Sequence, residues 1–438
     1  MEDKFDASKI EYERQRFKCA KMLVWACFFL NVLMMSSKNV FTAELVTLQG
    51  VFGTTKAQTS LAMTYYFITY AIGQIVLSAL FGKINLRIFL FTVGSLSAIV
   101  TIALGFTSSI TLAYVLCGIN GVFQAGIYSG CMGILAKYMP LKLLPYANRI
   151  MNISVAAWGV ISYGFSALFV GYGLWNVPFI ILGALFLISA IFFFYAAFRM
   201  KKFPTVVVEK NEPAPEKQKI DEKPFINVDG KKRKILFYFI VLAIVTLNNT
   251  TQYIVTNWIP DMLKTVYNMP DGYSILITII VPIISAICSL IAINYCEKIK
   301  NILKVGMFFM VISTLTILPL IFVYDLNIVV SIILLALTLS TAAGSRTVVG
   351  GVMAFKMRTR INSGSYIATT NAFAAITAGV IPPIAGAFID LFDGSLGYKW
   401  SYLVTFIISV ICLVVLFVFM AWYKKSNKKH EKTEENKN

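Results

Sequence analysis

Charged residues are scarce in this chain of 438 residues, where Asp, Glu, Lys and Arg together make up 14%. An ordinary soluble domain contains about a quarter of such residues. Hydrophobic residues make up 58% of the chain, and its mean hydropathy is +0.74. These values exclude an ordinary soluble enzyme. A membrane-spanning helix needs roughly 20 mostly apolar residues, and the sequence contains many such runs, so we expect an all-α polytopic membrane protein.

Residues that commonly carry catalysis are also rare. The single histidine, His430, lies in the hydrophilic C-terminal tail, where it cannot activate a nucleophile inside the apolar segments. The phosphate-binding pattern G-x-x-x-x-G-K-[ST] is absent, which excludes ATP-driven transport by this chain alone. The seven cysteines never form a CxxC pattern, which argues against a disulfide framework and a zinc site. We therefore expect no enzyme activity, no cofactor and no metal.

Hydropathy predicts twelve membrane spans, and no small-residue cleavage site marks the first of them as a signal peptide. The spans are expected at residues 20–43, 59–82, 88–107, 111–137, 150–173, 177–198, 235–258, 273–296, 303–323, 327–355, 363–390 and 400–423.

Positive charge accounts for the formal net charge of +18, and its position along the chain predicts topology. With a cytoplasmic N-terminus, 34 of the 39 Lys and Arg residues fall on the cytoplasmic side and only Lys56, Lys264 and Lys399 on the other. This asymmetry follows the positive-inside rule and predicts that both termini are cytoplasmic. Because topology explains the basic residues, we expect no nucleic-acid partner.

One long polar stretch, residues 199–234, divides the predicted spans into six and six. It has mixed charge and four prolines, which is typical of a linker. The predicted organisation is a cytoplasmic tail at 1–19, a six-helix half at 20–198, a cytoplasmic linker at 199–234, a six-helix half at 235–423 and a cytoplasmic tail at 424–438. This layout is that of the major facilitator fold.

Two cations remain inside predicted spans, and polar groups there usually face a cavity or a partner helix. Lys38 stands in the run Ser36-Ser37-Lys38-Asn39, whose consecutive polar side chains favour a solute-binding or coupling role over a lysine that reaches the outer interface. Arg346 stands ten residues before Lys356, roughly 15 Å along a helix. Its guanidinium could bind a carboxylate or phosphate with two hydrogen bonds, or satisfy helix-end carbonyls or an inner gate.

Polar residues in the first and seventh spans lie at similar depths, around Ser37 and Gln252, and a pseudo-two-fold axis would bring both to one central site. Carboxylates within spans are few. Glu44 and Asp390 both lie near predicted outer helix ends. Glu44 is the candidate for proton coupling, although an ordinary helix-end role is the stronger expectation for it.

The sequence resembles the organophosphate:phosphate antiporter family of the major facilitator superfamily, which includes glycerol-3-phosphate and hexose-phosphate transporters. The first span carries Ser37-Lys38-Asn39-Val40 where that family has Arg-Lys-Asn-Phe. The second span and its loop are similar over Ile68-Thr69-Tyr70-Ala71-Ile72-Gly73-Gln74 and the residues after it. The seventh span ends in Gln252-Tyr253 and Trp258-Ile259-Pro260, where the family has Arg-Tyr and Trp-x-Pro.

Departures from this family concern its phosphate site. The two family arginines that bind the phosphoryl group correspond to Ser37 and Gln252, and the family lysine of the second span corresponds to Gln74. The family histidine of the fifth span has only apolar counterparts such as Val155. A dianionic phosphate ester would lose most of its charge-assisted hydrogen bonds, each worth about 1.5–3 kcal/mol. The loop signature of the superfamily is reduced to Lys83 in the first half.

The second half keeps Glu297-Lys298, and these two residues with Lys83 are candidates for the conformational gate. The leading hypothesis is a monomeric secondary active transporter in the cell membrane, an antiporter by resemblance, that moves a small organic anion by alternating access. The residues expected to line its cavity are Lys38, Asn39, Tyr70, Gln74, Gln124, Tyr128, Asn152, Gln252, Tyr253, Arg346 and Asn371. Two alternatives stay open: a proton-coupled exporter of amphipathic compounds, and a solute sensor that binds without transport.

Overall fold

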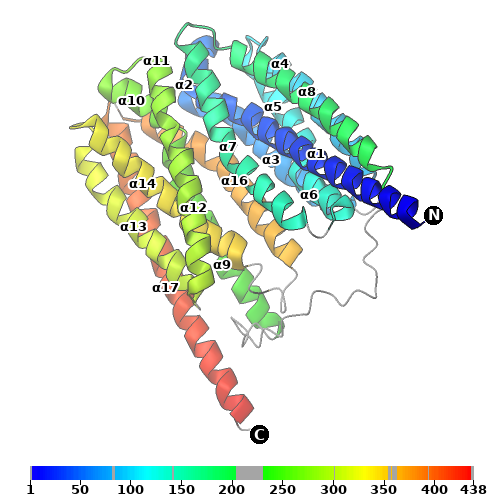
Figure 1. Ribbon diagram of the computed structural model, residues 1–438. Coiled ribbons are helices and arrows are strands. Elements are labelled where there is room, and N and C mark those ends of the chain that lie inside the picture. Colours follow the sequence, from blue (N-terminus) through cyan, green and yellow to red (C-terminus); the bar gives the residue numbers. More distant parts are fainter. Residues whose placement is uncertain are drawn as a thin grey trace. The chain divides into compact units, whose positions relative to one another are not determined.

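A computed structural model describes residues 2–80, 84–140, 143–203, 230–299, 301–353, 357, 363–392 and 394–435. The chain divides into two compact units, residues 1–44 with 69–220, and residues 45–68 with 221–438. Every regular element of the described residues is a helix (Figure 1). The predicted all-α fold is therefore confirmed.

The described residues of the first unit, residues 1–44 with 69–220, form seven helices or parts of helices. They are α1 (Glu2–Ala43), the second part of α3 (Lys56–Leu80), α4 (Leu86–Leu104), α5 (Ile110–Gln124), α6 (Ile127–Tyr138), α7 (Leu144–Val170) and α8 (Val177–Met200). Helix α1 packs along α7 and α8, and α4 packs along α8 and α5. The core of this unit gathers around α1 and includes Leu23, Leu30, Met34, Phe186 and Phe193.

The second unit, residues 45–68 with 221–438, contains the remaining helices. They are α2 (Leu45–Phe52), the first part of α3, α9 (Lys231–Thr256), α10 (Ile259–Tyr267), α11 (Asp271–Thr278), α12 (Ile280–Lys298), α13 (Ile302–Val323), α14 (Ile328–Arg346), the π-helix η2 (Thr347–Val352), α16 (Ser363–Asp390) and α17 (Leu396–Glu435). Two buried clusters form its core, one around Phe237 and Phe419 and the other around Trp258 and Tyr402.

Eleven helical segments of the described residues are long and apolar enough to cross a membrane. Some of them join two consecutive helices, as α9 and α10 do within Lys232–Tyr267. The predicted span at 150–173 falls on α7, whose described apolar stretch, Ala157–Val170, is shorter. Helices α1 and α17 also continue into the stretches expected as tails. Most of the expected linker, residues 204–229, lies outside the described residues.

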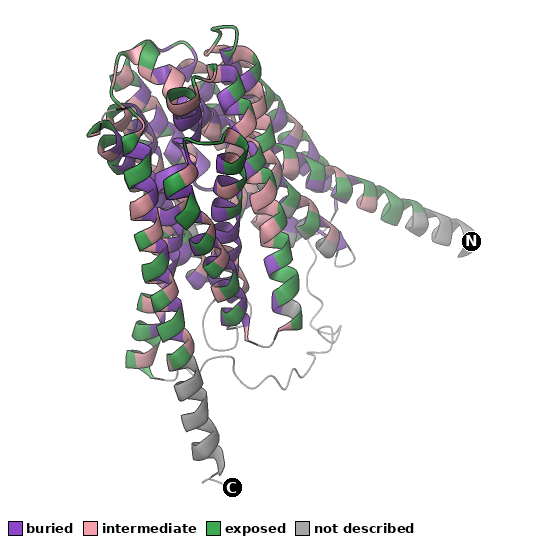
Figure 2. Ribbon diagram, turned by 90° about the vertical axis from the view of Figure 1, so that its left-hand side faces the viewer, coloured by how far each residue is buried: buried purple, intermediate pink, exposed green. Residues whose placement is uncertain are grey.

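Many helices bury one side and expose large apolar residues on the other (Figure 2). On α8, Leu182, Phe186 and Phe193 are buried, whereas Ile188 and Ile191 are exposed. An exposed apolar helix face is unfavourable in water and suits contact with lipid chains.

Asparagine side chains cap the N-termini of several membrane-length helices. Asn85 accepts a hydrogen bond from the Arg87 amide at the start of α4 (3.2 Å). Asn327 accepts from the Val329 amide at the start of α14 (2.9 Å). These caps satisfy amide groups that have no partner within the helix.

A proline in α16 creates a contact with α3 inside the second unit. Pro383 has no amide proton, so the carbonyl of Gly379, four residues earlier, loses its helical partner. The Thr64 hydroxyl of α3 donates to that carbonyl (2.6 Å). A Cβ atom added to Gly379 would lie 2.9 Å from the Phe67 Cβ, so the glycine allows this close approach. Neighbouring helices commonly satisfy backbone groups freed by proline in membranes.

Candidate functional site

The polar turn of α1 contains Ser37, Lys38 and Asn39, and its side chains are held mainly by the helix itself. The Lys38 ammonium lies 3.7 Å from the Met35 sulfur, and the Asn39 amide donates to the Met35 carbonyl (2.7 Å). Ser37 donates to the Met34 carbonyl (2.8 Å). Lys38 and Asn39 are half-buried. Local hydrogen bonds therefore fix the turn from which the Lys38 side chain leaves the helix.

Gln124 joins α1 to α4 and α5 through a buried polar network. Its amide nitrogen lies within hydrogen-bonding distance of the Ser37 hydroxyl (3.2 Å), the Ser97 hydroxyl (2.9 Å) and the Asn120 side-chain oxygen (3.2 Å). The Gln124 side chain is fully buried. Gln124 therefore connects the polar turn of α1 with α4 within the first unit.

Two other candidates in the first unit, Tyr70 and Gln74, contact each other. Gln74 donates to the hydroxyl of Tyr70 on the same helix (2.9 Å), and both side chains are half-buried. Tyr128 packs partly buried against the apolar core. The Asn152 side chain lies outside the described residues. Tyr70 and Gln74 therefore form one local pair.

Arg346 is the second of the two cations predicted inside spans, and it contacts the polar segment of α9. Its Nη1 atom donates to the side-chain oxygen of Asn249 (3.0 Å), whose own amide donates to the Val245 carbonyl (2.8 Å). Asn249 is fully buried, whereas Arg346 is half-buried. The sequence predicted Arg346 and a polar segment around Gln252, and the structure brings Arg346 to Asn249, three residues before Gln252. Gln252 and Tyr253 are half-buried on the same helix.

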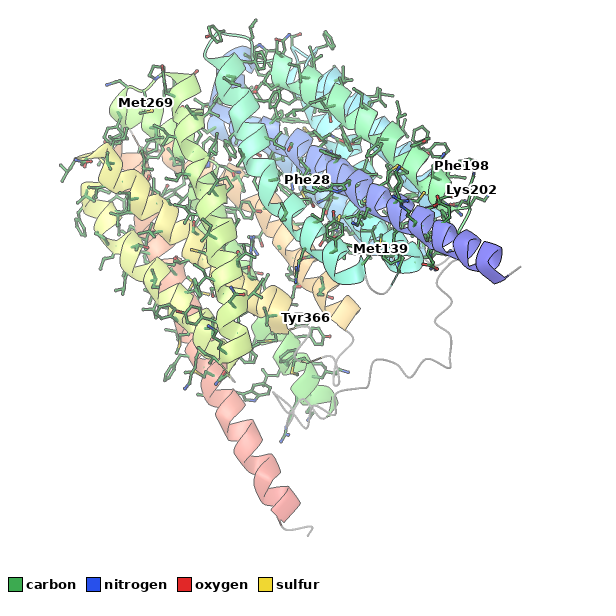
Figure 3. All side chains as sticks on the ribbon, viewed as in Figure 1. Phe28, Met139, Phe198, Lys202, Met269 and Tyr366 are labelled. Atoms are coloured by element: carbon green, nitrogen blue, oxygen red, sulfur yellow. The ribbon has the colours of Figure 1, made fainter. Side chains whose placement is uncertain are left out.

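Helix α14 changes to the π-helix η2 directly after Arg346. π-Helical turns are rare and occur frequently at functional sites. A Cβ atom added to Gly350 or Gly351 would meet nothing within 4 Å. Tyr366 of α16 donates to the Val349 carbonyl (2.5 Å), which fixes the segment from the other side; Figure 3 labels this tyrosine. The Gly350-Gly351 pair was the one sequence signal of this irregularity.

Asn371 is exposed on α16, apart from the contact between Arg346 and Asn249. The gate candidates are not brought together in the described part of the chain. Lys83 and the Glu297 side chain lie outside it, and Lys298 is exposed at the end of α12.

The second unit contains a cluster of charged residues that the sequence did not predict. The Lys56 ammonium is 2.9 Å from an Asp390 oxygen and 3.3 Å from an Asp261 oxygen. The Tyr398 hydroxyl also donates to Asp261. The side chains of Lys56 and Asp261 are only 18% and 7% exposed. Pro260, at the start of α10, places Asp261 in the first turn of a new helix, which was the available signal.

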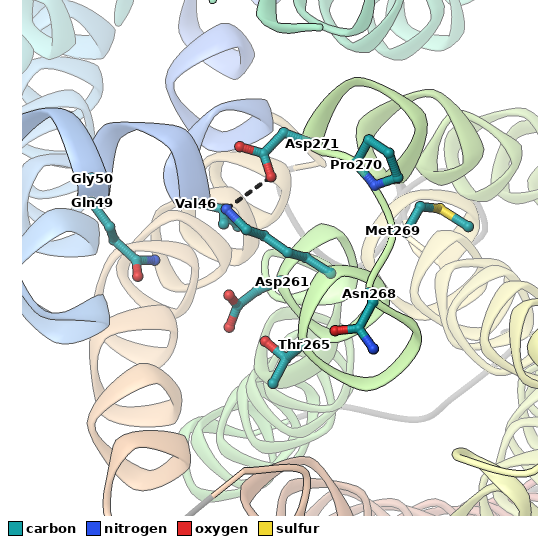
Figure 4. A pocket seen from close by; sticks show the side chains of 10 residues that line it. Val46, Gln49, Gly50, Asp261, Thr265, Asn268, Met269, Pro270 and Asp271 are labelled. Carbon is teal, nitrogen blue, oxygen red and sulfur yellow. Dashed lines mark ion pairs between the residues drawn. The ribbon is translucent and has the colours of Figure 1, made fainter.

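A cavity of ≈ 660 Å³ lies beside this cluster (Figure 4). Its wall comes from α2, α10 and the following loop, and includes Gln49, Asp261, Lys264, Asn268 and Asp271. Lys264 is paired with Asp271 (2.9 Å), as the dashed line in Figure 4 marks. With two carboxylates and one paired lysine, this wall does not favour an anion.

Glu44 follows the last residue of α1, at the helix end where the sequence predicts it, and its side chain is fully buried. Neither carboxyl oxygen has a hydrogen-bond partner among the described residues. Burial of a carboxylate in this way is unusual, because a charge away from water requires a partner.

Residues 24–363 match the family model described as Major Facilitator Superfamily. The fold is similar to that of a bacterial homologue of the human lysosomal transporter Spinster, solved in an inward-facing, unoccupied conformation. The two chains share 13% identity at a TM-score of 0.73, over 93% of this chain and 98% of that one. The nucleoside transporter NupG shares 16% identity at a TM-score of 0.65, over 93% of this chain and 99% of that one. No curated protein matches the sequence.

Proposed function

Because the chain belongs to the Major Facilitator Superfamily, we propose that it is a secondary active transporter that moves a small organic anion by alternating access. The proposal includes twelve spans, cytoplasmic termini, a monomeric state and a place in the plasma membrane. The charge asymmetry of the loops supports this topology. Exchange of one solute for another, as in the antiporters that the sequence resembles, is expected beside net uptake.

The environment of Arg346 is the observation that carries the anion assignment. A guanidinium has five N–H donors, and the contact with Asn249 uses Nη1. Asn249 is neutral and buried, so it orients the arginine without cancelling its charge. The π-helix η2 begins directly after Arg346, and a Cβ atom at Gly350 or Gly351 would meet nothing within 4 Å. This leaves room for a ligand beside that part of the helix. A planar, oriented guanidinium suits a carboxylate or phosphate.

Lys38 is proposed as the cation that binds anionic solute in the first unit, with Asn39, Tyr70 and Gln74 as further polar contacts. Gln124 supports Lys38 indirectly, since it bonds to Ser37 in the same turn. Tyr128, Gln252, Tyr253, Asn152 and Asn371 complete the proposed set. Because the positions of the antiporter arginines hold Ser37 and Gln252, we propose a carboxylate or another singly charged anion over a dianionic phosphate ester.

A stability screen identifies the solute. A ligand that binds only the folded protein raises its apparent stability, so purified protein is heated with monocarboxylates, sugar acids, phosphate esters and inorganic phosphate. Nucleosides are included because NupG is a nucleoside transporter. The proposal expects stabilisation by a monoanion. Stabilisation by neutral nucleosides alone would contradict the anion assignment.

Transport by variants then tests the two cations. Lys38→Ala and Arg346→Ala are each expected to abolish saturable uptake into proteoliposomes while insertion into the membrane continues. Lys264→Ala is the matched control, because it removes a cation whose side chain is 46% exposed and paired with Asp271. Uptake with wild-type kinetics by Lys38→Ala or by Arg346→Ala would refute the solute-binding role of the substituted residue.

A further inference from the structure

Glu44 lies where the chain passes from one compact unit to the other. The first unit includes Glu44, and the second begins at Leu45. Helix α1 ends at Ala43 and α2 starts at Leu45, with Glu44 forming the turn between them. Its amide still donates to the Val40 carbonyl (3.0 Å), so the backbone is satisfied and only the side chain is unusual.

The Glu44 carboxyl has no charge partner among the described residues. Its side chain is 0% exposed, and both oxygens lack hydrogen bonds. The polar group that acts on it is the Ser166 hydroxyl of α7, which is also buried and without a bond of good geometry. An ionised carboxylate buried in this way is strongly unfavourable, whereas the neutral acid can donate one hydrogen bond and accept others.

Charged groups on the surrounding helices lie away from Glu44. The helices packed against α1 are α4, α6, α7 and α8. Arg87, Lys137, Arg149 and Arg199 lie at the opposite ends of these helices. On α1 itself, Lys38 is six residues away, or about 9 Å along the helix. The titratable side chain nearest to Ser166 along α7 is Tyr163, which is buried and neutral in its ordinary state.

We propose that Glu44 is a proton-binding site whose protonation and deprotonation accompany the transport cycle; this inference rests on the proposed function. A buried carboxyl without a counter-ion is stable only with its proton bound. Deprotonation requires another conformation of the transport cycle, in which this side chain meets water or a polar partner. The proton then leaves, and its return favours the conformation described here.

Glu44→Gln tests the site, because glutamine has nearly the same shape and imitates the protonated acid without exchanging a proton. Asp325→Asn is the matched control, since it neutralises an exposed carboxylate in the turn after α13. Infrared spectra of the reconstituted proteins at neutral pH, where exposed carboxylates are ionised, are expected to show a protonated-carboxyl band in wild type and Asp325→Asn. The Glu44 contribution to this band is expected to be absent in Glu44→Gln. The same band in Glu44→Gln would overturn the assignment.

Transport of the radiolabelled monocarboxylates, sugar acids and phosphate esters of the screen tests the coupling. If one proton moves with each solute, a gradient of one pH unit supports about a tenfold difference in solute concentration across the vesicle membrane. Wild type and Asp325→Asn are expected to reach this difference. Glu44→Gln is expected to lose it while solute counterflow continues. A gradient response in Glu44→Gln equal to that of wild type would overturn the proposal. Wild-type protein without counterflow of any panel member would instead contradict the proposed function.

Discussion

Replacement of Lys56 by methionine is expected to destabilise the protein substantially, because it leaves two carboxylates without their shared cation. Lys56 contacts Asp390 at 2.9 Å and Asp261 at 3.3 Å, and it also donates its backbone amide to Asp390. Removal of one partner from a buried ion pair costs about 3–5 kcal/mol. Asp390 is 33% exposed, so part of its charge is screened by solvent. We therefore expect Lys56→Met to lower the free energy of unfolding by about 3 kcal/mol.

The same chain provides a control and a rescue. Lys264→Met breaks an ion pair of equal length, 2.9 Å, whose side chains are 46% and 28% exposed. Exposed pairs contribute about 0–1 kcal/mol, so this variant should differ little from wild type. The triple variant Lys56→Met, Asp261→Asn, Asp390→Asn removes all three charges and is expected to recover to within about 1 kcal/mol of wild type. The amide oxygen introduced by Asp261→Asn can still accept the hydrogen bond from Tyr398.

Unfolding is measured by titration with a denaturing detergent in mixed micelles, with helix content followed by circular dichroism. Equal losses for Lys56→Met and Lys264→Met, or a triple variant less stable than Lys56→Met, would refute the assignment of this cluster as a buried ion network.

Two further predictions concern helix packing. Gly344→Ala adds a Cβ atom 2.8 Å from Phe309 Cδ1 and should lower the free energy of unfolding by about 1–3 kcal/mol in the same titration. The Cβ atom of Gly350→Ala meets nothing within 4 Å, so this variant should not lose stability through a clash. Equal losses for the two variants would argue against close approach of α13 and α14. Gln124→Leu removes the buried hydrogen bonds that the Gln124 amide makes with Ser37 and Ser97, at about 0.5–1.5 kcal/mol each, and should raise the KM for solute. An unchanged KM would show that the network does not position the turn of α1.

The sequence predicted the membrane class well, because hydropathy acts over about 20 residues and needs no knowledge of tertiary contacts. It also identified Lys38 and Arg346 as the cations inside spans, since charge in an apolar segment is visible locally. Breaks within the helices were harder to predict from the sequence than the spans themselves. The turn at Glu44 carries neither proline nor glycine, and the change to a π-helix after Arg346 had only Gly350-Gly351 as a signal.

The sequence could not predict which side chains contact one another in the folded protein. Lys56 and Asp390 are 334 positions apart, and the pairing depends on how α3 packs against α16. The contact of Arg346 with Asn249 joins two predicted polar positions, but their meeting is a property of the folded helices α9 and α14. The hydrogen bonds of Gln124 with Ser37 and Ser97 likewise depend on how α5 packs against α1 and α4.

Solute counterflow directly tests whether Arg346 is needed for transport of a monoanion. Proteoliposomes preloaded with an unlabelled monoanion from the stability screen are diluted into the same labelled anion. Wild type and Lys264→Ala are expected to accumulate label transiently, and Arg346→Ala is expected to accumulate none. Counterflow of that anion by Arg346→Ala with wild-type kinetics would contradict the role of Arg346 in binding a transported anion.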